Sequence, residues 1–202
     1  MVQGEGGVIA LDPAFVKELA VFLKEQDILL MVDEVQTGNG RTGTMYAYMQ
    51  YGLQPDVVST AKGLAGGLPM GATLMSEKVK DVLSYGDHGS TFGGNPIAAA
   101  AALSIVERLT DDFLADVTRK SHMIRSLLED APGIESISGL GLMIGLKTTK
   151  PAAEVLATCR ENGVLCLTAK DKVRLLPALN IPDELLIKAA GVIKAACAPD
   201  NT

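Results

Sequence analysis

One lysine and one aspartate stand out in the sequence because each follows a short apolar run typical of a buried strand. Lys62 comes two residues after the β-branched segment 57–60, and Asp33 directly follows the apolar run 28–32. In open α/β sheets, ligands bind beyond the carboxyl ends of the strands. If the two strands are neighbours, Asp33 and Lys62 reach the same crevice.

These two residue types together suit Schiff-base chemistry. An apolar crevice desolvates an ammonium and favours the neutral amine, which attacks carbonyl groups. The glycines at 63, 66, 67 and 71 leave room beside Lys62 for a planar cofactor. A carboxylate in the same crevice would keep a pyridine nitrogen protonated, as in pyridoxal phosphate enzymes. Taken singly, either residue is more often structural, the lysine as a surface cation and the aspartate as a cap.

The elements that must position this pair follow an α/β pattern. The Asp12-Pro13 dipeptide predicts a capped helix over 13–26, within which apolar residues recur at helical spacing. Strands are expected at 28–32, 57–60 and 71–75. An alanine-rich helix over 96–109 and a second helix over 111–130 follow them.

In the last third of the chain, short predicted strands are interspersed with helices, which indicates a second, smaller α+β unit. We expect strands around a glycine turn in 133–148, and then further elements at 151–162 (helix), 164–168 and 172–176 (strands) and 183–197 (helix). We therefore predict a first domain over 1–97 and a second over 98–202, with 98–110 as the helix between them.

Composition excludes several classes of function. The net charge of −6 argues against nucleic-acid binding and against a basic membrane-surface helix, and no apolar run reaches the roughly 20 residues of a membrane span. Cys159, Cys166 and Cys197 lack C-x-x-C spacing, which favours buried reduced thiols. The two histidines, His88 and His122, cannot build a metal cluster. With no secretory signal at the start, we expect a cytoplasmic protein.

Several longer segments resemble those of one protein family. VDEVQTGNGRTG (32–43), STAKGLAGGLPMGA (59–72) and HGSTFGGNP (88–96) resemble signature segments of class III, ornithine-type aminotransferases and, among these, of acetylornithine aminotransferases. QGEGGV (3–8) and RLLPALNI (174–181) extend the likeness over nearly the whole chain. The resemblance implies the C-terminal half of a fold-type I pyridoxal-phosphate transferase, with part of a large domain built on a mostly parallel sheet and a small α+β C-terminal domain.

The resemblance also implies a cofactor, pyridoxal 5′-phosphate, and residues that hold it. Lys62 is similar to the lysine that binds the cofactor covalently and then moves the α-proton. Asp33 resembles the carboxylate on the pyridine nitrogen, Val35 the apolar residue against the ring, and Gln36 the residue near the phenolic oxygen. Thr91 resembles a hydroxyl that binds the cofactor phosphate of the partner subunit, which implies a homodimer.

Two further residues resemble a substrate clamp. Arg174, in an R-x-x-P-x-L segment, is similar to an arginine that binds a substrate carboxylate through its planar fork. Glu5 resembles the glutamate that pairs with this arginine and switches it between the two half-reactions. The implied reaction is transamination of N-acetylornithine, or a similar ω-amino substrate, with 2-oxoglutarate in arginine biosynthesis. A solvated loop charge at Glu5 and an edge-strand cation at Arg174 stay open as alternatives.

The chain also departs from the family. Members run to roughly twice this length, and the N-terminal half that carries the phosphate-binding loop has no counterpart here. Ser138 stands where relatives have an arginine, so we expect a lost contact. The glycine-rich segment 38–43 lacks the Lys-Ser/Thr of a P-loop, and we interpret it as a flexible turn.

Two alternatives to an active enzyme of this type stay open. In the first, the chain is an inactive or split-gene fragment that serves as a dimerisation module. In the second, it is another fold-type I enzyme with the same lysine and aspartate. A sheet cut in half exposes an edge, so we expect the chain to pair with a second copy, to pair with the missing half, or to be unstable.

Overall fold

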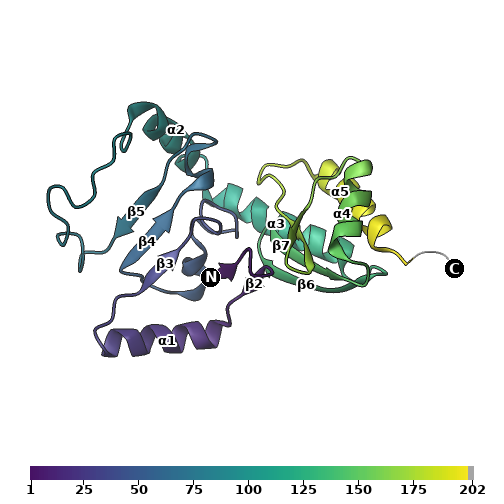
Figure 1. The fold of residues 1–202 in the computed structure, drawn as a ribbon, viewed down its shortest axis with the longest axis horizontal. Coiled ribbons are helices and arrows are strands. Elements are labelled where there is room, and N and C mark those ends of the chain that lie inside the picture. The colour runs from purple at the N-terminus through teal and green to yellow at the C-terminus, as the bar shows by residue number, and fades with distance from the viewer. Residues whose placement is uncertain (200–202) are drawn as a thin grey trace. The chain divides into compact units, whose positions relative to one another are not determined.

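The computed structural model describes residues 1–199 and contains two compact units (Figure 1). Unit 1 consists of Met1 and Leu11–Leu114, and unit 2 consists of Val2–Ala10 and the chain from Ala115 onward. This division differs from the predicted boundary at 97, because helix α2 (Pro96–Val106) packs on unit 1. There Ala102 joins Leu64 and Ala65 in one apolar cluster.

Unit 1 is built on a three-stranded sheet in the order β3-β4-β5. Strand β3 (Met31–Asp33) runs parallel to β4 (Val57–Thr60), and β5 (Ala72–Met75) pairs with β4 antiparallel, so this part of the sheet is mixed. β4 has the predicted bounds, whereas β3 starts three residues later than the expected strand at 28–32. Two short 3-10 helices, η1 (Ala47–Tyr51) and η2 (Lys62–Ala65), follow β3 and β4.

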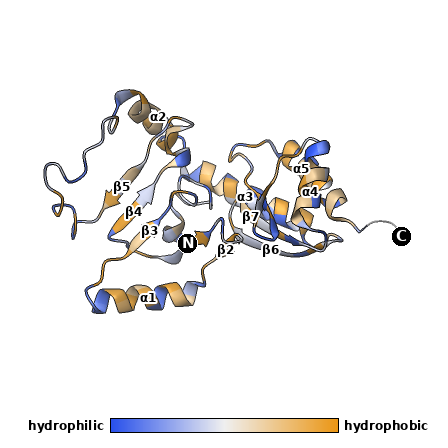
Figure 2. Ribbon diagram, in the orientation of Figure 1, coloured by the Kyte–Doolittle hydropathy of each residue, from blue (hydrophilic) through white to orange (hydrophobic). Residues whose placement is uncertain are grey.

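The helices of unit 1 begin as the sequence predicts. Helix α1 (Pro13–Glu25) is capped by Asp12, whose Oδ1 accepts a hydrogen bond from Phe15 N at 2.8 Å. Apolar and polar residues alternate along α1 (Figure 2), and this helix buries only Val16 while Phe22 is 53% exposed. Unit 1 thus leaves much of an apolar helix face uncovered within this chain.

Unit 2 contains a four-stranded antiparallel sheet in the order β6-β7-β9-β8. Its core lies on the central strand β7, where Met143, Ile144 and Leu146 are fully buried. The bounds of its elements are β6 (Ile134–Leu140), β7 (Met143–Thr148), β8 (Leu167–Ala169), β9 (Lys172–Leu175), α3 (Asp111–Leu128, which begins in unit 1), α4 (Ala152–Glu161) and α5 (Asp183–Cys197). A small hairpin of β1 (Val2–Gln3) and β2 (Ile9–Ala10) completes the unit.

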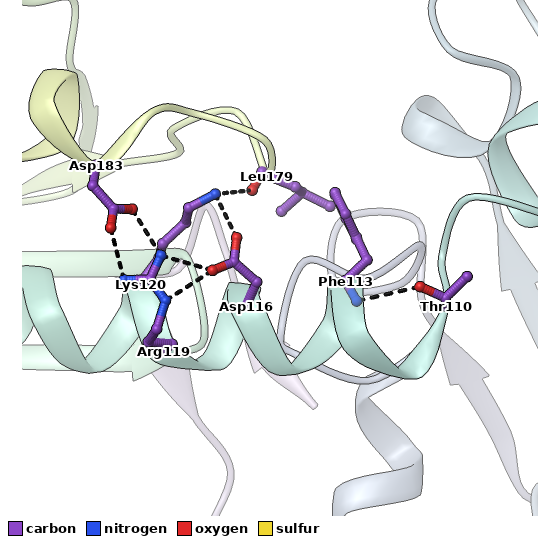
Figure 3. Close-up of polar contacts among 7 residues, drawn as sticks. All are labelled: Thr110, Phe113, Asp116, Arg119, Lys120, Leu179 and Asp183. Carbon is purple, nitrogen blue, oxygen red and sulfur yellow. Dashed lines mark hydrogen bonds and ion pairs between the residues drawn. The ribbon is translucent and has the colours of Figure 1, made fainter.

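Ion pairs tie α3 to the chain that follows β9 (Figure 3). Arg119 donates two hydrogen bonds of 2.8 Å to Asp183 at the start of α5. The buried Lys120 contacts Asp116 at 2.7 Å and donates to the Leu179 carbonyl at 3.3 Å. The segment between β9 and α5 is therefore held by α3 at two points, Leu179 and Asp183.

The three cysteines of unit 2 are unpaired, as expected. Cys159 and Cys197 are buried, and Cys166 is half-buried. None of the helices within residues 1–199 has the length and apolar character needed to cross a membrane.

Candidate active site

Strands β3 and β4 lie side by side in the sheet of unit 1 (Figure 1), and Asp33 and Lys62 lie at their carboxyl ends. Asp33 is the last residue of β3, and Lys62 is the second residue after β4 and the first of η2. Because β3 and β4 are parallel, with Asp33 opposite Ser59, their carboxyl ends point the same way. The condition under which the two residues were expected to share a crevice, that their strands are neighbours, is therefore met.

The predicted dry crevice around this pair is not formed by the residues of this chain that the structure describes. Both Asp33 and Lys62 are exposed. The residues after Lys62 explain part of this exposure, because Gly63, Gly66 and Gly67 have no side chains with which to cover it and are themselves exposed. A desolvated amine at Lys62 would need cover from atoms outside the described chain.

Asp33 and Glu34, the acidic pair at the end of β3, lie on opposite sides of the strand. The Asp33 side chain turns over the next residues, and its Oδ1 accepts a hydrogen bond from Val35 N at 2.8 Å. Glu34 is fully buried and accepts hydrogen bonds from Tyr48 N and the Thr37 hydroxyl. Sequence reasoning missed this second carboxylate. The signal was two adjacent acids at a strand end, since successive side chains point to opposite faces and one must face inward.

The side chains predicted to contact the cofactor ring and phosphate lie in different settings. Val35 and Gln36 directly follow the acidic pair and are half-buried. Thr91 lies in the exposed stretch 81–94, within a turn in which Gly93 N donates to the Ser90 carbonyl. The structure therefore groups Val35 and Gln36 with Asp33 in sequence and space, and leaves Thr91 on an exposed loop.

The glycine-rich loop 38–43 is packed, which differs from its interpretation as a flexible turn. Asn39 and Thr42 are buried, and burial lowers the pKa of the half-buried Arg41 guanidinium. The Asn39 Nδ2 donates to Thr60 Oγ1 at 3.2 Å and to the Ala61 carbonyl at 3.0 Å. The loop thus contacts the two residues that directly precede Lys62.

Lys62 has an unusual backbone conformation. Its φ of 49° lies in the left-handed region, where a residue with a Cβ is disfavoured by about 1–2 kcal/mol. Such strain persists where the surrounding structure fixes the backbone, and it is often found at functional sites.

The second predicted group, Arg174 with Glu5, lies in unit 2. Arg174 is on β9, between Gly145 of β7 and Leu167 of β8, and is only 7% exposed. Its Nη1 lies 2.6 Å from Glu5 Oε1, and its buried Nε has no hydrogen-bond partner within residues 1–199. The contact that the resemblance implies between these two residues is therefore present, and Arg174 is not an exposed edge-strand cation.

Glycines let the loop that carries Glu5 lie directly on the sheet. Val8 is fully buried against Met143 and has a left-handed φ of 53°. A Cβ atom on Gly145 would come within 2.9 Å of Val8 Cβ, and one on Gly139 within 2.8 Å of Val8 Cγ1. The absence of side chains at these two positions is what allows Val8, and with it the Glu5 loop, to approach the strands.

Ser138, where we expected a lost contact, makes a hydrogen bond of its own in this chain. Its hydroxyl accepts a hydrogen bond from Lys172 Nζ at 2.8 Å. Arg125 donates to the neighbouring Gly139 carbonyl at 3.1 Å. A lysine on β9 thus places a cation beside Ser138.

The chemistry of these groups fits pyridoxal phosphate. The Lys62 amine suits the aldehyde of that cofactor, and the Asp33 carboxylate suits its ring nitrogen. A nearly buried arginine suits a substrate carboxylate, because its planar fork binds carboxylates through two hydrogen bonds.

Comparison with known proteins agrees with this chemistry. The family model for class-III aminotransferases matches residues 1–197. The acetylornithine aminotransferase of Haemophilus ducreyi is 52% identical over 195 residues, which cover 96% of this chain and 50% of that protein. The one from Lactococcus lactis is 44% identical over 96% of this chain and 53% of its own length. The chain thus spans about half the length of these relatives.

Solved structures give the same result. The N-acetylornithine aminotransferase of Stenotrophomonas maltophilia superposes with a TM-score of 0.86 and 36% identity over 96% of this chain and 54% of that one. An ornithine aminotransferase of Toxoplasma gondii, which holds pyridoxal phosphate at partial occupancy in its active site, has a TM-score of 0.89 and 33% identity over 97% and 49% of the two chains. The chain belongs to the class-III aminotransferase family.

Proposed function

We propose that this chain carries the lysine-bearing part of a pyridoxal-phosphate-dependent aminotransferase. Its substrates are N-acetylornithine, or a similar ω-amino compound, and 2-oxoglutarate as the amino acceptor, in arginine biosynthesis. The observation that carries the proposal is the placement of Asp33 and Lys62 at the ends of two adjacent parallel strands. The names of the relatives support the amino donor.

In unit 1, each residue acts on a different part of the reacting system. Pyridoxal phosphate supplies, when bound, an aldehyde and a ring that withdraws electrons from the substrate carbon. Lys62 Nζ would hold the cofactor at its aldehyde carbon and, when free, would take a proton from the substrate carbon that bears the transferred amino group and return it. Asp33 would hold a proton on the ring nitrogen, Val35 would pack against the ring, and Gln36 would bind the phenolic oxygen.

In unit 2, Arg174 binds a substrate carboxylate and Glu5 controls when it does so. The pair lies at 2.6 Å, with Arg174 buried and 71% of the Glu5 side chain exposed. An exposed carboxylate moves away at little cost, whereas the buried guanidinium keeps its position. Glu5 therefore neutralises Arg174 when no carboxylate substrate is bound and leaves when one arrives.

The exposure of Lys62 and Asp33 supports the proposal that additional protein covers the active site. Lys62 and Asp33 are uncovered, and a groove of about 800 Å³ beside α1 is lined both by apolar side chains, such as Val21 and Ile28, and by charged ones, such as Lys24. These observations favour a second candidate role, in which the chain is one half of a split enzyme and pairs with a chain that carries the remaining half. Thr91 would then bind the cofactor phosphate of a partner subunit in the assembled dimer.

A mixing experiment tests these roles. The 202-residue chain is assayed for glutamate formation from 2-oxoglutarate and N-acetylornithine, alone and after mixing with the N-terminal half of the Haemophilus ducreyi relative. We expect activity on mixing that Lys62→Ala removes. Absence of activity in both assays would contradict the enzyme role and leave a dimerisation module.

A further inference from the structure

We propose that Asn39 is a positioning residue for Lys62, because it fixes the peptide group from which the lysine extends. The inference rests on the proposed role of Lys62 and adds a residue that the motif comparison left without a function. It is carried by three features of unit 1: the hydrogen bonds of the Asn39 amide, the burial of that amide, and the backbone conformation of the residues it joins.

The Asn39 amide contacts the chain just before the lysine. Its Nδ2 lies 3.0 Å from the carbonyl oxygen of Ala61 and 3.2 Å from the hydroxyl of Thr60. The Ala61 carbonyl and the Lys62 nitrogen belong to one planar peptide group. A bond that fixes this carbonyl therefore also fixes the direction in which the Lys62 Cα leaves the strand.

The same carbonyl also starts η2. Leu64 N donates to the Ala61 oxygen at 3.1 Å, so this oxygen accepts one bond from the loop and one from the 3-10 helix. Lys62, between them, has the left-handed φ of 49°. Two bonds on one oxygen oppose relaxation of this residue to a more common conformation.

The orientation of the Asn39 amide follows from its partners. A carbonyl oxygen can only accept, so the NH₂ group must face Ala61. The amide oxygen, Oδ1, is buried without a partner in the described chain. An unsatisfied buried acceptor is costly, and the side chain nonetheless keeps this arrangement.

The loop backbone is shaped to hold Asn39 in place. Asn39 has a φ of 55°, and asparagine tolerates this left-handed region better than most residues. Gly38 N donates to the Glu34 carbonyl at 2.9 Å, and a Cβ on Gly38 would come within 2.9 Å of a Tyr46 ring carbon. The loop is therefore anchored immediately before Asn39.

Three substitutions separate the hydrogen bond from the backbone requirement. Asn39→Gly keeps the left-handed φ accessible but removes the amide. Asn39→Asp keeps the shape but turns an oxygen toward the Ala61 oxygen. Thr42→Val is the matched control, because Thr42 is buried in the same loop and its hydroxyl has no partner within residues 1–199.

Two measurements on the 202-residue chain test the proposal. The first is hydrogen exchange of the peptide spanning 60–66 without cofactor, where we expect about fivefold faster exchange in Asn39→Gly, as one lost hydrogen bond predicts. The second, made after mixing with the N-terminal half of the Haemophilus ducreyi relative, is the yield of the borohydride-reduced adduct on Lys62 after addition of pyridoxal phosphate, where we expect about a tenfold loss in Asn39→Gly. Thr42→Val should match the wild type in both.

The outcomes distinguish the positioning role from the role of Lys62. Unchanged exchange in Asn39→Gly, or an unchanged adduct yield beside an unaltered fold, would overturn the positioning role. If Asn39→Asp fails to fold, Asn39→Gly still decides the question. Absence of an adduct in the wild type would contradict the role of Lys62, and the exchange comparison would then decide whether Asn39 holds the peptide.

Discussion

Unit 1 presents its lysine on an exposed sheet edge, whereas unit 2 buries its arginine under a loop of the same unit. Lys62 and Asp33 are open to solvent, and only the backbone of Lys62 is fixed by its surroundings. Arg174 is 7% exposed and already has its carboxylate partner, Glu5. The comparison teaches that orientation and cover are separate requirements: unit 2 supplies both, and unit 1 supplies orientation alone.

The largest expected effect tests how tightly unit 2 is built. Gly139→Ala would place a Cβ 2.0 Å from the Met143 carbonyl oxygen, at a φ of 95°. We expect a loss of about 4 kcal/mol in the free energy of unfolding of unit 2, through overpacking and backbone strain. Chemical denaturation followed by circular dichroism measures it.

The control for this substitution lies in unit 1. A Cβ on Gly89 would meet nothing within 4 Å, so Gly89→Ala should leave stability unchanged within about 0.5 kcal/mol. Equal effects of the two substitutions would remove the contrast between a tightly packed and an open unit.

The next largest effect is the pH dependence of the free energy of unfolding of unit 2. Burial raises the pKa of the Cys197 thiol from 9.0 to about 11. Between these values the folded state retains a proton that the unfolded chain has released, so this contribution is fully present below pH 9 and is lost as pH rises to 11. It amounts to at most about 3 kcal/mol. Denaturation between pH 8 and 11, compared with Cys197→Ala, measures it, and an identical slope in both proteins would contradict it.

We expect the stability of unit 1 to fall at a higher pH than the range in which Cys197 affects the stability of unit 2. Burial raises the pKa values of Tyr46, Tyr48 and Tyr51 above 10.0. Because these pKa values are also raised in the folded state, the contribution of the three tyrosines to the free energy of unfolding is present below pH 10 and is lost above it.

The smallest effect concerns the switch at Arg174. Glu5→Gln removes the charge that competes with a substrate carboxylate, and we expect 2-oxoglutarate to bind the chain about fivefold more tightly, or about 1 kcal/mol. Isothermal titration calorimetry measures the affinity, and Arg174→Gln is the control that should lose binding. Weaker binding to Glu5→Gln than to the wild type would show that Glu5 helps to hold the substrate.

Local signals in the sequence predict most of the fold. Asp12-Pro13 predicts the start of α1, and the β-branched run predicts β4 with the bounds that the structure has. Capping and β-propensity act over a few residues, so a short window of sequence contains them. The placement of Asp33 and Lys62 at the same end of the sheet also follows, because parallel neighbours are typical of this α/β pattern.

Other features depend on contacts between distant residues and could not be derived from local patterns. Glu5 and Arg174 are 169 positions apart, and only the family resemblance joined them. The burial of Asn39 requires the loop after β3 to meet the end of β4, which no periodicity indicates. The exposure of Lys62 was missed because the sequence pattern describes which residues approach one edge, but not what covers that edge.

The central claim is that Lys62 is the group that binds the cofactor. Its most direct test is to mix the 202-residue chain with the N-terminal half of the Haemophilus ducreyi relative, add pyridoxal phosphate, reduce with borohydride and map the modified peptide by mass spectrometry, with Lys24→Ala as the control for a surface lysine. The account predicts modification concentrated at Lys62, absent in Lys62→Ala and unchanged in Lys24→Ala. Modification spread evenly over the surface lysines, with no excess at Lys62, would contradict it.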